Sequence, residues 1–491
     1  MAVQNSSSLS ASDLIAGQRN IDVPFRVSVK LEQQDLDLFC QQVFRLLPGK
    51  RLVALAQLGG EQVVAKIFIG ARGVRDYERE KQGVAALVRA GVSTPDILAQ
   101  GDVSGGGKIL LFRYLSNSRS LLDLWAEPLD RNRRLEILRQ VVVSIAKMHQ
   151  AGVVQEDIHL DNFLHQSAEL YTIDGGGVRR QRSGRPISET RGVKNMAGFF
   201  AQLLPGYDHL AESVLPDYEQ VRGFRKSTDR VARLRKQIGI ERDLRKRKYL
   251  KKIFRDCSQI VHQSGFRQSL LCERRDWSRE LAQVLTDPDT AMSRGRPLKT
   301  GNTATVVGIE VDDKLLVVKR YNIKNLMHGF RRLFKTSRAR RSWYSAHLME
   351  FLGIPGARPV ALLEKRWGPF CLTAYFISES VQGPDAREYF KQKNPSDEDL
   401  LAMAGIVMDI AVHRIAHGDL KDTNFLMSDR GPVLIDLDSM REYRSARLFE
   451  KAAAKDLGRF LQNWTGQTEL MDRFQGILTQ ICSDRKDPNQ T

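Results

Sequence analysis

The sequence contains two copies of one arrangement of acidic and amide side chains. The spacing D-x4-N-x11-D occurs at Asp157, Asn162 and Asp174 and again at Asp419, Asn424 and Asp436. In this order, the first aspartate can orient and deprotonate a hydroxyl group, while the asparagine and the second aspartate can hold Mg2+ on nucleotide phosphates. The repeated spacing therefore predicts two catalytic loops for transfer of a phosphoryl group from ATP.

A lysine lies inside an apolar, strand-like run upstream of the first loop. It is Lys66 in the run Val63–Phe68, and an isolated lysine in such a strand most often faces solvent. A helix-like segment follows from Tyr77 to Val88, however, and it contains Glu80. A glutamate there can pair with the strand lysine and aim it at the nucleotide phosphates. We therefore expect Lys66 and Glu80 to form an ion pair beside bound ATP.

The second half of the chain repeats the strand lysine but not the helix acid. Lys319 lies in the apolar run Leu315–Tyr321, and alignment of the two halves places Ser342 opposite Glu80. Glu350 is a poor substitute, because its distance along the helix turns it roughly 80° away from Ser342 about the axis. The second unit is therefore expected to lack the helix glutamate.

Other residues of the second unit are placed to contact phosphates. Gly301 and Thr303 lie in a turn of small residues, where backbone N–H groups can approach phosphate oxygens. Lys421 follows Asp419 closely and is placed to neutralise the transferring phosphoryl group, whereas the first unit has His159 at that position. These differences predict that both units bind nucleotide but differ in rate or acceptor.

The elements that must position these residues follow the same order in both halves. In the first half, strand-like runs lead to a hinge-like run at residues 110–115, and a helix-like segment at 132–149 leads into the catalytic loop. Three glycines at 175–177 predict a flexible segment. A later helix at 194–200 corresponds to one at 455–460. We therefore predict an α+β protein with two tandem protein-kinase-like folds, each with a small β-rich lobe and a larger helical lobe.

The length and composition of the chain allow more than one hydrophobic core. It has 491 residues, of which 42% are hydrophobic. The composition changes around the segment from Asp287 to Pro297. The expected segments are a flexible N-terminus (1–22), a first kinase-like domain (23–285), a linker (286–297) and a second kinase-like domain (298–491).

The chain is strongly basic, with a formal net charge of +18 and a pI of about 9.7. This charge favours partners that carry phosphate groups or an anionic membrane surface. A dense basic segment lies at residues 222–255, and two interpretations of it remain open: a solvated helical face that closes the first domain, or an anion-binding surface. Nucleic acid is an unlikely partner, because the sequence contains no recognised binding module or interleaved aromatic platform.

The cysteines and the N-terminus predict a cytoplasmic protein. The five cysteines are scattered and without C-x-x-C spacing, so neither a zinc site nor a disulfide framework is indicated. The first residues lack the basic and apolar regions of a signal peptide, and no apolar run is long enough to span a membrane. We expect the protein to be soluble or peripheral to a membrane.

Three motifs of the second unit resemble the bacterial lipopolysaccharide core kinase family of the Kdo/WaaP type. They are Arg338–Trp343, Gly353–Pro355 and His417–Asp419, and the resemblance covers about residues 45–200 and 297–465. It implies an enzyme that uses ATP and Mg2+ to phosphorylate Kdo or heptose hydroxyls of the lipid-A-linked core. It also implies that this lipid-linked sugar is met on the cytoplasmic face of the inner membrane.

The resemblance also assigns roles to individual residues. The implied bases are Asp157 and Asp419, and the lysines that hold phosphates are Lys66 and Lys319. The implied metal ligands are Asn162, Asp174, Asn424 and Asp436.

The first unit departs from the family pattern. Gln155 and Glu156 precede Asp157 where a histidine-containing pair is usual, and Asp174 lacks the following Phe-Gly. Whether one or both units are active is therefore open. Two other interpretations also remain: a kinase for a protein or another small molecule, since the loop chemistry does not select the hydroxyl, and a nucleotide-binding scaffold without catalysis. ATP turnover separates the scaffold from the kinases.

Overall fold

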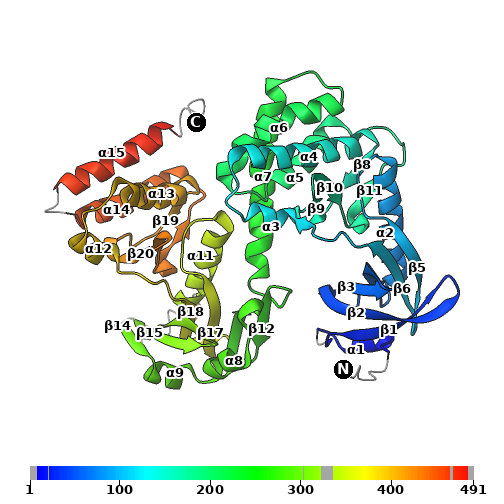
Figure 1. Ribbon diagram of the computed structural model, residues 1–491. Coiled ribbons are helices and arrows are strands. Elements are labelled where there is room, and N and C mark those ends of the chain that lie inside the picture. The colour runs from blue at the N-terminus through cyan, green and yellow to red at the C-terminus, as the bar shows by residue number, and fades with distance from the viewer. Residues whose placement is uncertain (1–7, 20, 302–303, 322–335, 465–467, 485–491) are drawn as a thin grey trace. The chain divides into compact units, whose positions relative to one another are not determined.

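Two compact units make up the chain, Met1–Asp243 and Leu244–Thr491. The computed structural model describes residues 8–19, 21–301, 304–321, 336–464 and 468–484. The boundary between the units lies inside one continuous helix, α7 (Thr228–Lys252). Each unit combines a β-rich part with a helical part, so the predicted α+β class is confirmed (Figure 1).

A closed barrel forms the β-rich lobe of the first unit. Its strands bury alternate side chains, as expected when one face of a pleated strand lines a core. Gly59 and Gly60 join β3 to β4, and their positive φ angles of 56° and 91° suit a tight hairpin. In the order in which they pair, the strands are β1 (Phe25–Leu31), β2 (Gln34–Leu47), β3 (Arg51–Leu58), β4 (Glu61–Phe68), β6 (Gly107–Arg113) and β5 (Ile97–Val103).

The N-terminal segment packs on this barrel. Helix α1 (Ala11–Ala16) begins at a capping box formed by the Ser10 side chain. Ala11 and Leu14 are buried within the apolar cluster of the barrel. This packing corrects the expectation of a flexible N-terminus at residues 1–22 for the part that the structure describes.

Helices dominate the rest of the first unit. Asp130 caps α4 by accepting a hydrogen bond from the Arg133 backbone N–H at 2.9 Å, and the buried face of α4 packs in the apolar core of this lobe. The helices are α2 (Gly73–Arg89), α3 (Leu121–Trp125), α4 (Arg131–Gln150), α5 (Glu189–Phe200), α6 (Asp208–Val221) and the first part of α7. Short strands frame the catalytic loop: β7 (Arg119–Ser120), β8 (Val153–Gln155), β9 (Phe163–Gln166), β10 (Glu169–Thr172) and β11 (Val178–Arg180).

An antiparallel sheet forms the β-rich lobe of the second unit, with helices α8 (Arg279–Thr286), α9 (Pro288–Arg294) and α11 (Arg338–Leu352). In the order in which they pair, its strands are β12 (Ile260–Ser264), β13 (Gln268–Glu273), β17 (Pro359–Trp367), β18 (Phe370–Glu379), β16 (Lys314–Tyr321), β15 (Ala304–Val311) and β14 (Arg296–Thr300).

This sheet includes residues that were expected in the first domain. Strand β13 pairs with β17 from Gln268 opposite Lys365 to Cys272 opposite Ala361, so the backbone groups of β13 on that side are satisfied within the second unit. The expected linker at 286–297 forms instead the end of α8, all of α9 and the start of β14. The boundary between compact units therefore lies earlier, inside α7.

The helical lobe of the second unit repeats the arrangement around the catalytic loop. Its helices are α12 (Ala386–Gln392), α13 (Asp397–Val412), α14 (Ala446–Gln462) and α15 (Thr468–Asp484). Its short strands are β19 (Ile415–Ala416), which pairs with β22 (Arg441–Glu442), and β20 (Phe425–Ser428), which pairs with β21 (Gly431–Leu434).

Several basic side chains of residues 222–255 form ion pairs inside a single unit. Arg230 pairs with the buried Glu219, and Arg242 donates two hydrogen bonds to Asp208 at 2.9 and 2.5 Å. These contacts favour the interpretation that this face of α7 closes the first unit. Towards the C-terminal end of α7, the basic residues Arg247, Lys248, Lys251 and Lys252 are exposed. In the part of the chain that the structure describes, no helix has the length and apolar character needed to cross a membrane.

Candidate active sites

The strand lysine and the helix acid of the first unit form the predicted ion pair. Lys66 on β4 contacts Glu80 on α2, and the Glu80 side chain is fully buried. Alternate residues of β4 face the barrel core, which leaves Lys66 on the opposite face, toward α2. The Lys66 ammonium also lies 5.1 Å from the centroid of the Phe112 ring. The side chain is therefore fixed before any phosphate is bound.

Asp174 and Arg51 complete this charged cluster. Arg51 Nη1 lies 3.3 Å from Asp174 Oδ1, and Lys66 Nζ lies 3.8 Å from the same oxygen. Burial opposes the charge on Asp174, but Lys66 and Arg51 together hold the pKa of this carboxyl below its ordinary value. The group is therefore ionised at neutral pH, as a metal ligand must be.

The three glycines after Asp174 form a turn that α2 packs against directly. The backbone N–H groups of Gly175 and Gly176 donate to the Glu80 carboxylate at 3.0 and 2.9 Å. A Cβ atom on Gly83 of α2 would lie 1.9 Å from the Gly175 carbonyl oxygen. The helix can approach this closely because neither side of the contact carries a side chain. The predicted flexible segment is thus a short 3-10 turn held by Glu80.

The catalytic loop of the first unit brings Asp157 and Asn162 together. Asn162 Nδ2 donates to the Asp157 carbonyl oxygen at 2.6 Å, which leaves the amide oxygen for a cation. Nε2 of His159 lies 2.6 Å from Asp157 Oδ1, so an imidazole stands where the second unit has a lysine. Nδ1 of His159 lies 3.2 Å from Gln202 Oε1, which fixes the ring.

Gln155 takes over the hydrogen bond that a histidine makes in the second unit. His417 Nε2 lies 3.0 Å from the Ile435 carbonyl oxygen, one residue before Asp436. Gln155 Nε2 donates to the Ile173 carbonyl oxygen at the same distance, one residue before Asp174. Gln155 therefore preserves the hydrogen bond to the residue that precedes Asp174.

Lys319 of the second unit is held by two carboxylates that follow strand β21. Its Nζ lies 2.5 Å from Asp436 Oδ1 and 3.2 Å from Asp438 Oδ2. Burial alone would lower the pKa of Lys319, but nearby acidic groups, these two included, raise it above the ordinary value. Burial likewise opposes ionisation of Asp436, whose pKa Lys319 nevertheless lowers. Both groups are charged at neutral pH.

Helix α11 contributes a basic residue, Arg338, to this cluster, whereas α2 contributes the acidic Glu80 to the first one. Arg338 Nη2 lies 2.8 Å from Asp438 Oδ2. Ser342 contacts no carboxylate in this cluster, and its hydroxyl lies 2.7 Å from the Tyr321 hydroxyl. Glu350 pairs with Arg275 at 3.0 Å and takes no part in holding Lys319, as predicted.

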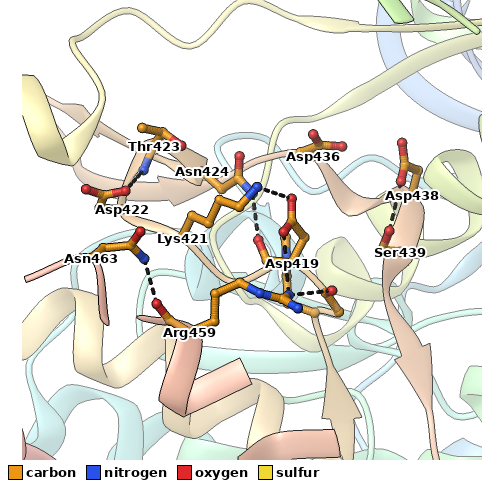
Figure 2. A network of polar contacts seen from close by, with 12 residues as sticks. Asp419, Lys421, Asp422, Thr423, Asn424, Asp436, Asp438, Ser439, Arg459 and Asn463 are labelled. Carbon is orange, nitrogen blue, oxygen red and sulfur yellow. Dashed lines mark hydrogen bonds and ion pairs between the residues drawn. The ribbon is translucent and has the colours of Figure 1, made fainter. Parts of the chain in front are cut away.

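The catalytic loop of the second unit places a cation on each side of Asp419 (Figure 2). Lys421 Nζ lies 2.8 Å from Asp419 Oδ2, and Arg459 Nη1 lies 3.5 Å from Asp419 Oδ1. Asn424 Nδ2 donates to the Asp419 carbonyl oxygen at 2.8 Å, the same contact as in the first unit. Asp456 accepts the Gly418 backbone N–H at 2.9 Å and so fixes the start of the loop.

The oxygen donors of each unit fit Mg2+ when nucleotide is bound. An amide oxygen and a carboxylate, Asn162 with Asp174 and Asn424 with Asp436, are hard ligands, and Mg2+ commonly adds phosphate oxygens to such a pair. The described residues contain no group of three or more histidine, cysteine, aspartate or glutamate side chains that could hold a metal by itself. Gly301 lies in the expected phosphate-contacting turn, where its backbone N–H donates to the Ala304 carbonyl oxygen at 3.2 Å, whereas Thr303 lies outside the described residues.

Four charged residues of the two clusters were not predicted: Arg51, Arg338, Asp438 and Arg459. The sequence D-L-D at residues 436–438 was a visible signal, because it places a second carboxylate two residues after Asp436. The sequence did not indicate which carboxylates the arginines contact, since Arg51, Arg338 and Arg459 lie far along the chain from Asp174, Asp438 and Asp419.

Comparison with known families supports the resemblance drawn from the motifs. Residues 70–179 match the model of the Lipopolysaccharide kinase (Kdo/WaaP) family. This segment contains Glu80, Asp157, Asn162 and Asp174 of the first unit, so the predicted family is confirmed there, and that family is one of kinases. A search of curated proteins gave no match to the chain.

Proposed function

We propose, from the match of residues 70–179 to a lipopolysaccharide kinase family, that the chain is an ATP-dependent phosphotransferase with two nucleotide-binding units. Its acceptor is a hydroxyl group of heptose or Kdo in the lipopolysaccharide core. The observation that carries the proposal is the repeated cluster: each unit groups a strand lysine with the second aspartate of the motif, at 3.8 Å for Lys66 and Asp174 and at 2.5 Å for Lys319 and Asp436.

In each unit the residues have separate tasks. Lys66 and Lys319 hold phosphate oxygens of ATP, and Asp157 and Asp419 orient the acceptor hydroxyl and receive its proton. A bond then forms between the acceptor oxygen and the γ-phosphorus as the bond from that phosphorus to the bridging oxygen breaks, which releases ADP. Mg2+ held by the asparagine and the second aspartate neutralises phosphate charge. Lys421 supplies a further positive charge beside Asp419.

The acceptor and the basic surface belong together in this proposal. A core sugar attached to lipid A lies at an anionic membrane surface, and the exposed bases of α7 give the protein an affinity for such a surface. The protein would then work on the cytoplasmic face of the inner membrane as a peripheral protein.

Two measurements test the proposal. Calorimetry should detect ATP binding to the folded chain that strengthens when Mg2+ is added. Incubation with labelled ATP and core oligosaccharide should transfer the label, and phosphate analysis should locate it on heptose or Kdo. No nucleotide binding in either condition would reject the kinase assignment, while Mg2+-dependent binding without transfer to any acceptor would favour a scaffold.

A further inference from the structure

The two units hold the strand lysine with carboxylates from different elements. This difference decides which carboxylate stays with the lysine when a metal binds. In the first unit, Lys66 pairs with Glu80, which is not a proposed metal ligand. Lys66 therefore keeps its ion pair with Glu80 when Asp174 binds a metal. In the second unit, the nearer partner of Lys319 is Asp436, which is itself the proposed metal ligand. Once Asp436 binds metal, Lys319 needs another carboxylate.

Asp438 is the carboxylate available for that task. It is only 2% exposed, and it already lies 3.2 Å from Lys319. The Ser439 hydroxyl donates to its Oδ1 at 3.1 Å, which leaves Oδ2 for cations (Figure 2). Burying a charged carboxylate lowers stability unless positive groups compensate its charge. Lys319 alone cannot compensate Asp438 while it also binds the nucleotide phosphates.

Arg338 supplies the compensation from an unusual position. It is the first residue of α11, and the first turn of that helix contains no acidic residue. Positive charge at a helix N-terminus is unfavourable, because the partial charge of the helix dipole there is also positive. Arg338 nevertheless lies with Nη2 2.8 Å from Asp438 Oδ2, and its guanidinium lies 5.1 Å from the centroid of the Tyr321 ring. The contact with Asp438 offsets that unfavourable placement.

The same charges occur in both units on exchanged elements. The first cluster has Lys66 and Arg51 with Glu80 and Asp174, and the second has Lys319 and Arg338 with Asp436 and Asp438. Alignment of the loops places Asp438 where the first unit has Gly176, whose N–H binds Glu80. In place of an acidic residue on the helix, the second unit thus has a basic residue on the helix, Arg338, and an acidic residue in the loop, Asp438.

We propose that Arg338 and Asp438 are positioning residues of the second unit, with Arg338 fixing Asp438 and Asp438 holding Lys319 for the nucleotide phosphates. This inference rests on the proposed phosphotransferase function. It assigns to the pair the role that Glu80 has in the first unit.

The test uses the full chain with Asp174→Asn, so that the second unit determines the activity. Arg338→Gln should lower kcat/KM for ATP about tenfold while leaving the KM for the acceptor unchanged, and Arg338→Lys should restore most of the loss. Arg340→Gln is the matched control, because it removes the same charge from the same helical turn, where Arg340 pairs with Glu364. Melting temperatures establish that each variant is folded. If Arg338→Gln is unfolded at the assay temperature, Arg338→Gln and Arg340→Gln are compared by ATP-binding calorimetry at a lower temperature at which both are folded, and only Arg338→Gln should weaken ATP binding.

A double-mutant cycle with Asp438→Asn separates positioning from general weakening. If Arg338 acts through Asp438, the double variant should lose little more than either single variant. Additive losses, or equal effects of Arg338→Gln and Arg340→Gln, would overturn the inference while leaving the proposed function intact. Absence of ATP binding by the unsubstituted chain would reject the proposed function itself.

Discussion

At the scale of single residues, the two proposed bases have different cationic neighbours. Asp157 faces the His159 imidazole at 2.6 Å, whereas Asp419 faces the Lys421 ammonium at 2.8 Å. The ammonium of lysine and the imidazole of histidine differ in size, in geometry and in the number of hydrogen bonds that they donate. The two sites should therefore differ in rate even if they accept the same sugar.

We predict that Asp157→Asn and Asp419→Asn will have unequal effects on phosphate transfer to core oligosaccharide. Each substitution keeps the size of the side chain but removes the base. The residual activity of Asp419→Asn, which comes from the first unit, should change when His159→Lys is added, because this substitution gives Asp157 the neighbour that Asp419 has. Transfer rates of the single and double variants test this, with circular dichroism as the control for folding. Equal partial losses for Asp157→Asn and Asp419→Asn would point to interchangeable sites.

At the scale of elements, the contact of α2 with the glycine turn can be tested by a single methyl group. Gly83→Ala places a Cβ 1.9 Å from the Gly175 carbonyl oxygen, so the helix must move away from the turn and Glu80 with it. We expect a loss of about 1–3 kcal/mol in the free energy of unfolding and weaker nucleotide binding by the first unit. Urea unfolding and calorimetry measure the two effects.

Gly239→Ala is the matched control for that substitution. Gly239 lies in helix α7, and a Cβ there would meet no atom within 4 Å. Because alanine favours helix more than glycine does, this variant should gain roughly 0.5–1 kcal/mol of stability. A Gly83→Ala variant that behaved like Gly239→Ala would show that the close contact with the turn is unimportant.

A buried histidine makes the first helical lobe sensitive to acid. His149 Nδ1 lies 2.9 Å from the Tyr218 hydroxyl, and Nε2 lies 3.0 Å from Asn195 Oδ1. Burial lowers the pKa of His149 to about 4, so the folded state keeps the neutral ring while the unfolded chain binds a proton below about pH 6.5. Protons therefore favour unfolding, and the contribution of His149 to stability is lost as pH falls from about 6.5 to about 4.

We predict that this loss reaches on the order of 3 kcal/mol and that His149→Gln removes it. The free energy of unfolding of this variant, from urea titrations between about pH 4 and 7, should depend less steeply on pH than that of the unsubstituted chain. His209→Gln, an exposed histidine on α6, should leave the slope unchanged. Equal slopes for all three proteins would contradict the prediction.

At the scale of the whole molecule, the exposed bases of α7 should govern contact with anionic surfaces. Neutralising Arg247, Lys248, Lys251 and Lys252 should reduce co-sedimentation with vesicles of anionic lipid, because each such base contributes about 1 kcal/mol near the surface. The binding should also weaken as salt rises. A control variant neutralises four exposed bases on other elements: Lys391, Arg430, Arg447 and Lys451. Equal losses in both variants would assign the binding to net charge alone.

Much of the fold and part of each site could be predicted from local signals in the sequence. The hairpin containing Lys66, the pair with Glu80 and both loop asparagines could be predicted, because each depends on short spacings. Arg51 and Arg338 could not, since their contacts with Asp174 and Asp438 form only after the chain folds. The predicted domain boundary was wrong for a similar reason. In sequence, β12 and β13 resemble the end of the first domain, and only the pairing of β13 with β17 assigns them to the second unit.

The place of β13 beside β17 bears on any attempt to divide the gene. A fragment that began at residue 286 would lack β12 and β13, and the edge of β17 that they cover would be left with unpaired backbone groups. Such a fragment should aggregate on expression. One that began at Leu244, where the second compact unit starts, would retain its sheet intact and is the better starting point for producing the second unit on its own.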